Sequence, residues 1–161
     1  METELQKAIY AALTSAGQET LLLDFVNGQY LVGNADRQQA VDTLNDLVKG
    51  IYDYVPQPND AGNPADFPYV TIGEDTLNAW DTDTTTGADA SITLHTWSRY
   101  KGKKEVKAIQ GAIYAALNRA TLPITGYSFV TCDLLTSDSI VDSDGITQHG
   151  VQTFRILFNT A

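Results

Sequence analysis

Residues 91–119 read SITLHTWSRYKGKKEVKAIQGAIYAALNR, and the change of period inside this stretch decides the fold. Apolar and polar side chains alternate over 91–99, which predicts a half-buried strand. Over 103–119 the apolar residues recur at helical spacing, which predicts an amphipathic helix. Its apolar stripe consists of Val106, Ile109, Ile113, Ala116 and Leu117, and a second side carries the small residues Ala108, Ala112 and Ala115.

The chain after this helix predicts more sheet. Residues 127–135 alternate as a strand, and 138–143 with 146–158 indicate a hairpin around Asp144-Gly145. In the last strand the odd-numbered and the even-numbered positions both include apolar residues, so we expect this strand to be central or covered on both faces. An acidic cluster at the hairpin is better explained as a turn than as a calcium loop, because it lacks the spaced oxygens and the terminal Glu.

The chain before residue 91 adds two predicted strands. They cover 51–55 and 68–75 and are separated by a proline-rich loop over 56–67. The segment Thr76–Ala90 is rich in Asp and Thr, with Trp80 as its one large side chain. It forms either a long hairpin tip or a mobile loop.

Near the N-terminus the pattern predicts a helix over 4–16, a hairpin over 20–33 and a second helix over 35–49. The hairpin follows from apolar runs on both sides of Asn27-Gly28, a pair that suits a tight turn.

These elements define an α+β fold: a mostly antiparallel sheet with two main helices packed on one side, plus an inserted hairpin and helix near the N-terminus. The sequence contains no internal repeat and no linker. We therefore expect residues 1–161 to form a single domain.

The net charge of the chain excludes some kinds of binding partner. Twenty acidic residues against ten Lys and Arg give a net charge of −10, which disfavours free nucleic acid and anionic membranes. The single cysteine, Cys132, excludes an intrachain disulfide and fits a reducing compartment. A polar N-terminus and the lack of any long apolar run lead us to expect a cytoplasmic protein.

The search for chemistry is negative. Cys132 lies within a strand, and the two histidines, His95 and His149, lack metal-ligand spacing. No glycine-rich phosphate loop follows a strand. We therefore expect no enzyme, no cofactor and no metal centre, and interpret the chain as an assembly subunit.

Several segments together resemble the tail-completion or tail-terminator family of long-tailed bacteriophages and gene transfer agents. The likeness covers roughly 1–16 and 48–158, and residues 18–47 look like an insertion. The segments are IYDYVPQ at 51–57, FPYVTIGEDT at 67–76, LHTWSRY at 94–100, GKKEVKAI at 102–109, and Asp142–Gly145 followed by His149-Gly-Val.

The resemblance implies a small subunit that forms a six-fold ring on the last ring of the tail tube. The ring stops tube growth and offers its other face to the connector proteins of the head. DNA passes through its channel without sequence-specific binding. The implied partners are other copies of the chain, the tail tube protein and the head–tail connector, and the implied location is the neck of the virion after assembly in the host cytoplasm.

A ring needs heterologous contacts, in which two different patches meet. The basic run Arg99–Lys107 facing the acidic segment Thr76–Asp89 is one candidate, and Trp80 is a second unless the loop folds back and buries it. The candidate interface residues are Trp80, Asp81, Asp83, Arg99, Tyr100, Lys101, Lys103, Lys104 and Lys107.

Other functions remain open at this point. A neck or head-completion protein of similar fold would share most of these features. A small acidic domain that binds a ligand or mimics DNA is a different class, and an enzyme is a third.

Overall fold

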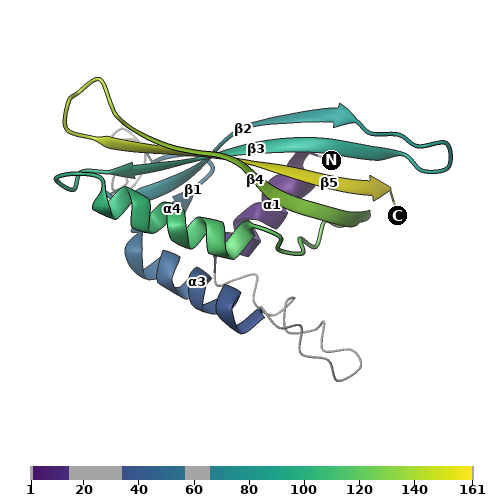
Figure 1. Ribbon diagram of the computed structural model, residues 1–161, viewed down its shortest axis with the longest axis horizontal. Coiled ribbons are helices and arrows are strands. Elements are labelled where there is room, and N and C mark those ends of the chain that lie inside the picture. Colours follow the sequence, from purple (N-terminus) through teal and green to yellow (C-terminus); the bar gives the residue numbers. More distant parts are fainter. Residues whose placement is uncertain (1, 15–33, 57–65, 161) are drawn as a thin grey trace.

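The protein has one five-stranded sheet with its helices on one side, as the computed structural model shows (Figure 1). Residues 2–14, 34–56 and 66–160 are described, so the predicted hairpin over 20–33 and most of the loop over 56–67 lie outside them. The α+β class is confirmed. The elements are α1 (Glu2–Leu13), α3 (Asn34–Leu47), β1 (Ile51–Tyr52), β2 (Tyr69–Ala79), β3 (Gly87–Ser98), α4 (Lys104–Leu117), β4 (Tyr127–Val141) and β5 (Gln148–Thr160).

The sheet is mixed rather than purely antiparallel. Its strand order is β1-β2-β3-β5-β4; β1 pairs with β2 in parallel, and every other pairing is antiparallel. The last strand, β5, lies between β3 and β4, so the prediction of a central strand is confirmed. Four neighbouring strands, β2, β3, β5 and β4, therefore form one long antiparallel ladder.

The hairpin around Asp144-Gly145 is also confirmed. Gly145 has φ +70°, a conformation that favours glycine, and its N–H donates to the carbonyl of Asp142 at 3.0 Å. The Asp144 carboxylate accepts hydrogen bonds from Ile146 N and from Thr147, and these bonds lower the pKa of Asp144 to about 2. The acidic cluster therefore builds a turn.

The prediction of two strands over 127–135 and 138–143 is wrong, because both belong to β4. β4 pairs with β5 along its whole length, with register shifts between Phe129 and Thr131 and between Leu134 and Thr136. A bulge inserts an extra residue and shifts the alternation of side chains by one position. The second register shift, between Leu134 and Thr136, lies where the alternation of apolar and polar residues in the sequence is interrupted. This interruption is why the sequence pattern predicted two strands instead of one.

The segment Thr76–Ala90 forms the far end of the hairpin of β2 and β3, so the hairpin alternative is confirmed and the mobile-loop alternative is wrong. β2 continues to Ala79 and β3 begins at Gly87, so only 80–86 form the turn. The side chains here are polar because this part of the sheet extends beyond the helices (Figure 1). The ladder from β3 to β5 stabilises this segment, and on β3 the side chains of Ala88 and Ala90 are buried in the core.

The core lies between the sheet and the helices. α4 packs across β3, β4 and β5, α1 packs against β2, and α3 packs against α4 and α1. The largest fully buried side chains include Phe154 and Phe158 of β5. A Cβ at Gly150 would lie 2.8 Å from Val106 Cγ2, so this glycine allows the close approach of α4 to the sheet.

Candidate assembly surfaces

The sheet face opposite the helices is a candidate surface for contact with other subunits. Along β3 and β5 buried residues alternate with half-buried or exposed ones. The buried residues face the helices, and the others face the opposite side of the sheet. We call the second set the open face. It consists of Asp89, Ser91, Thr93, His95 and Trp97 of β3, paired with Leu157, Arg155, Thr153, Val151 and His149 of β5.

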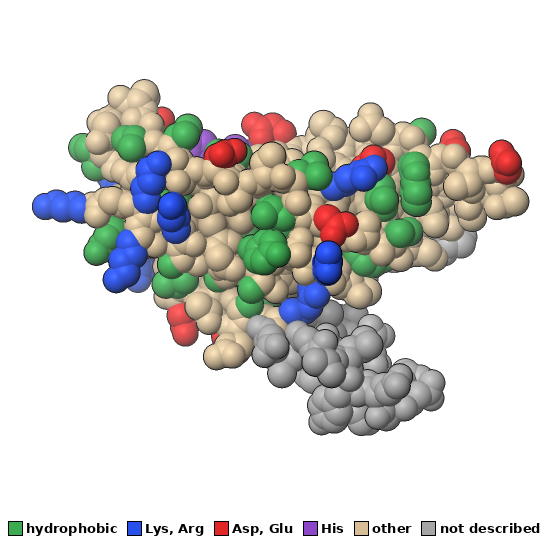
Figure 2. All heavy atoms as spheres, viewed as in Figure 1, with side chains coloured by type: hydrophobic (Ala, Val, Ile, Leu, Met, Phe, Trp, Pro, Cys, Tyr) green, Lys and Arg blue, Asp and Glu red, His purple; other side chains and the backbone are tan. Residues whose placement is uncertain are grey.

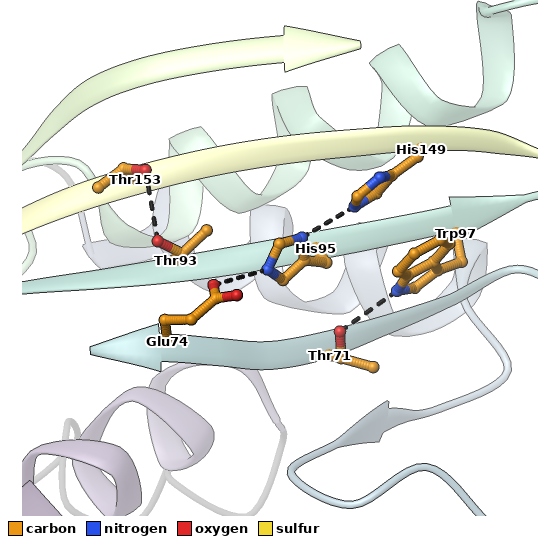
Figure 3. A network of polar contacts seen from close by, with 7 residues as sticks. All are labelled: Thr71, Glu74, Thr93, His95, Trp97, His149 and Thr153. Carbon is orange, nitrogen blue, oxygen red and sulfur yellow. Dashed lines mark hydrogen bonds and ion pairs between the residues drawn. The ribbon is translucent and has the colours of Figure 1, made fainter. Parts of the chain in front are cut away.

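A stack of aromatic rings crosses one end of the open face (Figure 3). The rings of Trp97 and His149 lie 3.9 Å apart, centroid to centroid, and are tilted by 7°. His149 Nε2 lies 2.8 Å from His95 Nδ1, and His95 Nε2 lies 3.1 Å from Glu74 Oε2. With both rings neutral, each Nε2–H can donate along this chain, ending at the carboxylate.

The partial burial of His149 makes stability depend on pH. Burial, followed by the nearby His95, lowers the pKa of His149 below its usual 6.5, despite opposing effects of Asp142 and Glu74. The folded state therefore binds fewer protons than the unfolded state just below pH 6.5, so stability is full above that pH. It is lost progressively as the pH falls toward the folded pKa.

We expect the melting temperature to fall as pH drops from 7.5 to about 5. Replacement of His149 by phenylalanine keeps a ring over Trp97 and removes this titration, so the fall between about pH 6.5 and 5 should become shallower. Thermal unfolding followed by circular dichroism measures both curves. An identical slope in His149→Phe would contradict the assignment.

The basic candidates lie together at one end of the molecule (Figure 2). The Arg99 guanidinium lies 4.3 Å from the centroid of the Phe67 ring, and Lys103 Nζ donates to the Ser139 carbonyl at 2.7 Å. Tyr100 is 49% exposed. The other exposed basic side chains here are Lys101, Lys104 and Lys107, so we call residues 99–107 the basic end.

The acidic candidates lie at the opposite end, on the turn between β2 and β3 (Figure 2). Trp80 is 36% exposed, so the alternative in which the loop buries it is wrong. Asp81 Oδ1 accepts a hydrogen bond from Gly87 N at 3.1 Å, and Asp83 is exposed. Asp89 is already paired with Arg155 at 2.7 Å. We call residues 80–86 the acidic tip.

A groove of about 580 Å³ lies between α4 and β4, which is an edge strand. Lys107, Gly111 and Tyr114 of α4 line one side, and Leu134 of β4 and Gln152 of β5 line the other. Outside the groove, β4 and its turn expose the apolar side chains Val130, Leu135, Ile140, Val141 and Ile146. An exposed, apolar edge strand is a frequent site of association.

The described residues show no arrangement typical of catalysis. Burial raises the pKa of the Cys132 thiol to about 12, so it is not a nucleophile at neutral pH. Among the residues that the structure describes, no three His, Cys, Asp or Glu side chains are placed to hold a metal ion. None of the described helices is both long and apolar enough for a membrane span.

Fold and surfaces together define an assembly subunit: a sheet with one open face, ends of opposite charge, and an open groove. The sequence model of the family described as "Tail completion protein gp17" matches residues 35–159. The chain belongs to this family, which is a family of structural phage tail proteins and not of enzymes.

Three known proteins are similar to this chain. The chain is 29% identical over 98 residues to "Tail completion protein gp17" of Bacillus phage SPP1, covering 61% of this chain and 72% of that protein. A chain in the "Virion of native gene transfer agent (GTA) particle" has the same fold, with TM-score 0.64 and 22% identity over 81% of this chain and 99% of that one. The structure of bacteriophage SPP1 gp17 aligns at TM-score 0.42 and 23% identity over 82% and 94% of the two chains.

Some features of these surfaces were not predicted from the sequence. The contact between His95 and His149 joins strands 54 positions apart, and the groove joins α4 to a strand that follows it. Only knowledge of strand register could have revealed them. The hypothesis that 18–47 is an insertion stays a prediction; the family match begins at residue 35 and thus includes most of α3.

Proposed function

We propose that this protein is the tail terminator of a phage or phage-like particle. In this proposal six copies form a ring on the last ring of the tail tube and stop its polymerisation. The opposite face of the ring receives the head–tail connector, in the neck of the virion. DNA passes through the channel, whose acidic wall does not bind the negatively charged phosphate backbone.

The observation that supports a ring most directly is the separation of charge along the molecule. The basic end and the acidic tip lie at opposite ends of the long axis (Figure 2). Two different, complementary patches on one subunit form a heterologous contact, which closes into a ring when the rotation allows it. Among the described residues, the side chains of Lys101, Lys104 and Lys107 in the basic end and of Asp83 in the acidic tip have no hydrogen bond or ion pair, whereas Lys103 and Asp81 have hydrogen bonds.

The position of the basic residues also favours a partner role. Lys103 and Lys104 lie at the N-terminus of α4, where the positive end of the helix dipole repels cations. Lys103 makes no side-chain cap of the helix. Lys103 donates instead to the Ser139 carbonyl of β4, whereas Lys104 has no partner among the described residues, so a contact with an acidic surface gives Lys104 a function.

Tail length tests the proposal. Particles produced without this gene should show tails much longer than normal, beside DNA-filled heads without tails, in negative-stain electron microscopy. Complementation with the intact gene is the control. Tails of normal length that fail to join heads would instead assign the protein to the connector side, and intact particles would overturn a role in assembly.

A further inference from the structure

A glycine, Gly111, lines the groove between α4 and β4, and no packing contact within the described residues requires a glycine at this position. Gly111 lies in the middle of α4, and apart from its own helix no described atom lies within 4 Å of the position that its Cβ would occupy. Glycine destabilises a helix interior relative to alanine. Since the described part of the chain leaves this space free, the glycine fits an approach by another molecule.

A buried polar atom in the groove needs a hydrogen-bond donor. Gln152 is 2% exposed, and its Nε2 donates to the carbonyl of Gln110 at 3.1 Å. Its Oε1 is buried and has no hydrogen-bond partner among the described residues. Native proteins rarely leave such an atom unpaired, so an incoming N–H is expected here.

The acidic tip carries a side chain with the matching chemistry. The indole of Trp80 has a flat apolar body and one N–H donor, and it stands on an ordered turn: Trp80 N donates to Gly87 O at 2.9 Å. In the groove, Tyr114 and Leu134 offer apolar walls. We propose that Trp80 of one copy inserts into the α4–β4 groove of the next copy and donates its N–H to Gln152 Oε1.

The charges around the two patches agree with this contact. Lys107 and Asp138 line the groove, and Lys104 lies one turn before Lys107 on α4, so the lysines outnumber the carboxylate here. Asp81 and Asp83 accompany Trp80 on the acidic tip. Insertion therefore brings opposite charges together around a buried aromatic anchor, an arrangement common in stable interfaces. The inference rests on the proposed ring and identifies its anchor.

Fluorescence of Trp80 tests the insertion. The chain has two tryptophans, so replacing Trp97 by phenylalanine leaves Trp80 as the only tryptophan, whose emission is excited selectively at wavelengths that tyrosine does not absorb. On assembly, either with rising protein concentration or on purified tail tubes that lack this protein, the emission should shift to shorter wavelength. Quenching of Trp80 by acrylamide should fall severalfold at the same time.

Substitutions at Gly111 test the same contact by changing the groove instead of the inserted tryptophan. Gly111→Leu fills the space and should weaken assembly by about 30-fold, as should Trp80→Ala, because each removes an anchor contact. Gly111→Ala adds one methyl group and is the matched control, with a much smaller loss. Both Gly111 variants should melt at a higher temperature than the parent, which separates a blocked groove from misfolding.

A double variant shows whether the two changes act on one contact. Trp80→Ala combined with Gly111→Leu should lose no more than either change separately. Additive losses, or a Trp80 that stays fully quenchable in assembled rings, would overturn the insertion and leave the ring itself in place. Normal tails in the absence of the gene would instead overturn the ring.

Discussion

Reversal of Lys103 and Lys104 to glutamate should weaken assembly by about tenfold at each contact between subunits at physiological salt. Both lysines belong to the basic end, and reversal turns attraction toward the acidic tip into repulsion. A closed ring repeats the same contact at each subunit, so the loss recurs around the ring. Sedimentation velocity, or binding to capless tail tubes, measures the change.

The acidic tip supplies the matched rescue. Asp83→Lys in the same chain should restore part of the lost assembly, because the charges are then exchanged rather than removed. Asp81 is unsuitable for this purpose, since its carboxylate accepts the hydrogen bond from Gly87 N.

A control must change the net charge by the same amount elsewhere. Lys7→Glu with Lys49→Glu does so on exposed positions outside the basic end. This control variant should assemble like the parent. Undiminished assembly of the Lys103/Lys104 variant at physiological salt would rule out the charge pairing, whereas a defect that disappears with added salt would support it.

Replacement of Phe154 by alanine should cost about 3–5 kcal/mol of unfolding free energy, the usual range for a large buried aromatic. Phe154 is fully buried on β5, with Ile92 of β3 and Leu134 of β4 as its cross-strand partners. The change leaves a cavity where the sheet meets the helices. Because small domains are stable by only about 5–15 kcal/mol, a large part of the stability is lost.

Urea unfolding followed by circular dichroism measures this loss. Ile146→Ala is the matched control, because it also removes an apolar side chain, one that is 64% exposed on the turn after β4. It should change stability by less than about 0.5 kcal/mol. A Phe154→Ala variant as stable as the control would show that the core does not lie between β5 and the helices.

Local patterns were sufficient to predict most helices and strands. The stripe of Val106, Ile109 and Ile113 placed α4 within one residue at its start, and the Asp144-Gly145 pair marked the turn between β4 and β5. These signals depend on neighbours a few positions apart, which a sequence displays directly. The family resemblance, carried by segments from 51 to 151, was likewise confirmed by the match over 35–159.

The sequence pattern failed where the structure departs from regular alternation. The bulges in β4 made one strand look like two, and the polar ends of β2 and β3 looked like a loop. In both places the pairing with a neighbouring strand, rather than the local pattern, determines the conformation.

By itself, the sequence determined the α+β class, the acidic charge, the lack of a recognisable catalytic motif and the elements that build the core. Only the tertiary structure decided which residues lie together on the surface of the protein. It placed the basic end opposite the acidic tip, brought His95 against His149, and opened the groove beside Gly111. The physical reason is that hydrophobic periodicity is local, whereas strand register and helix docking join residues far apart in the chain.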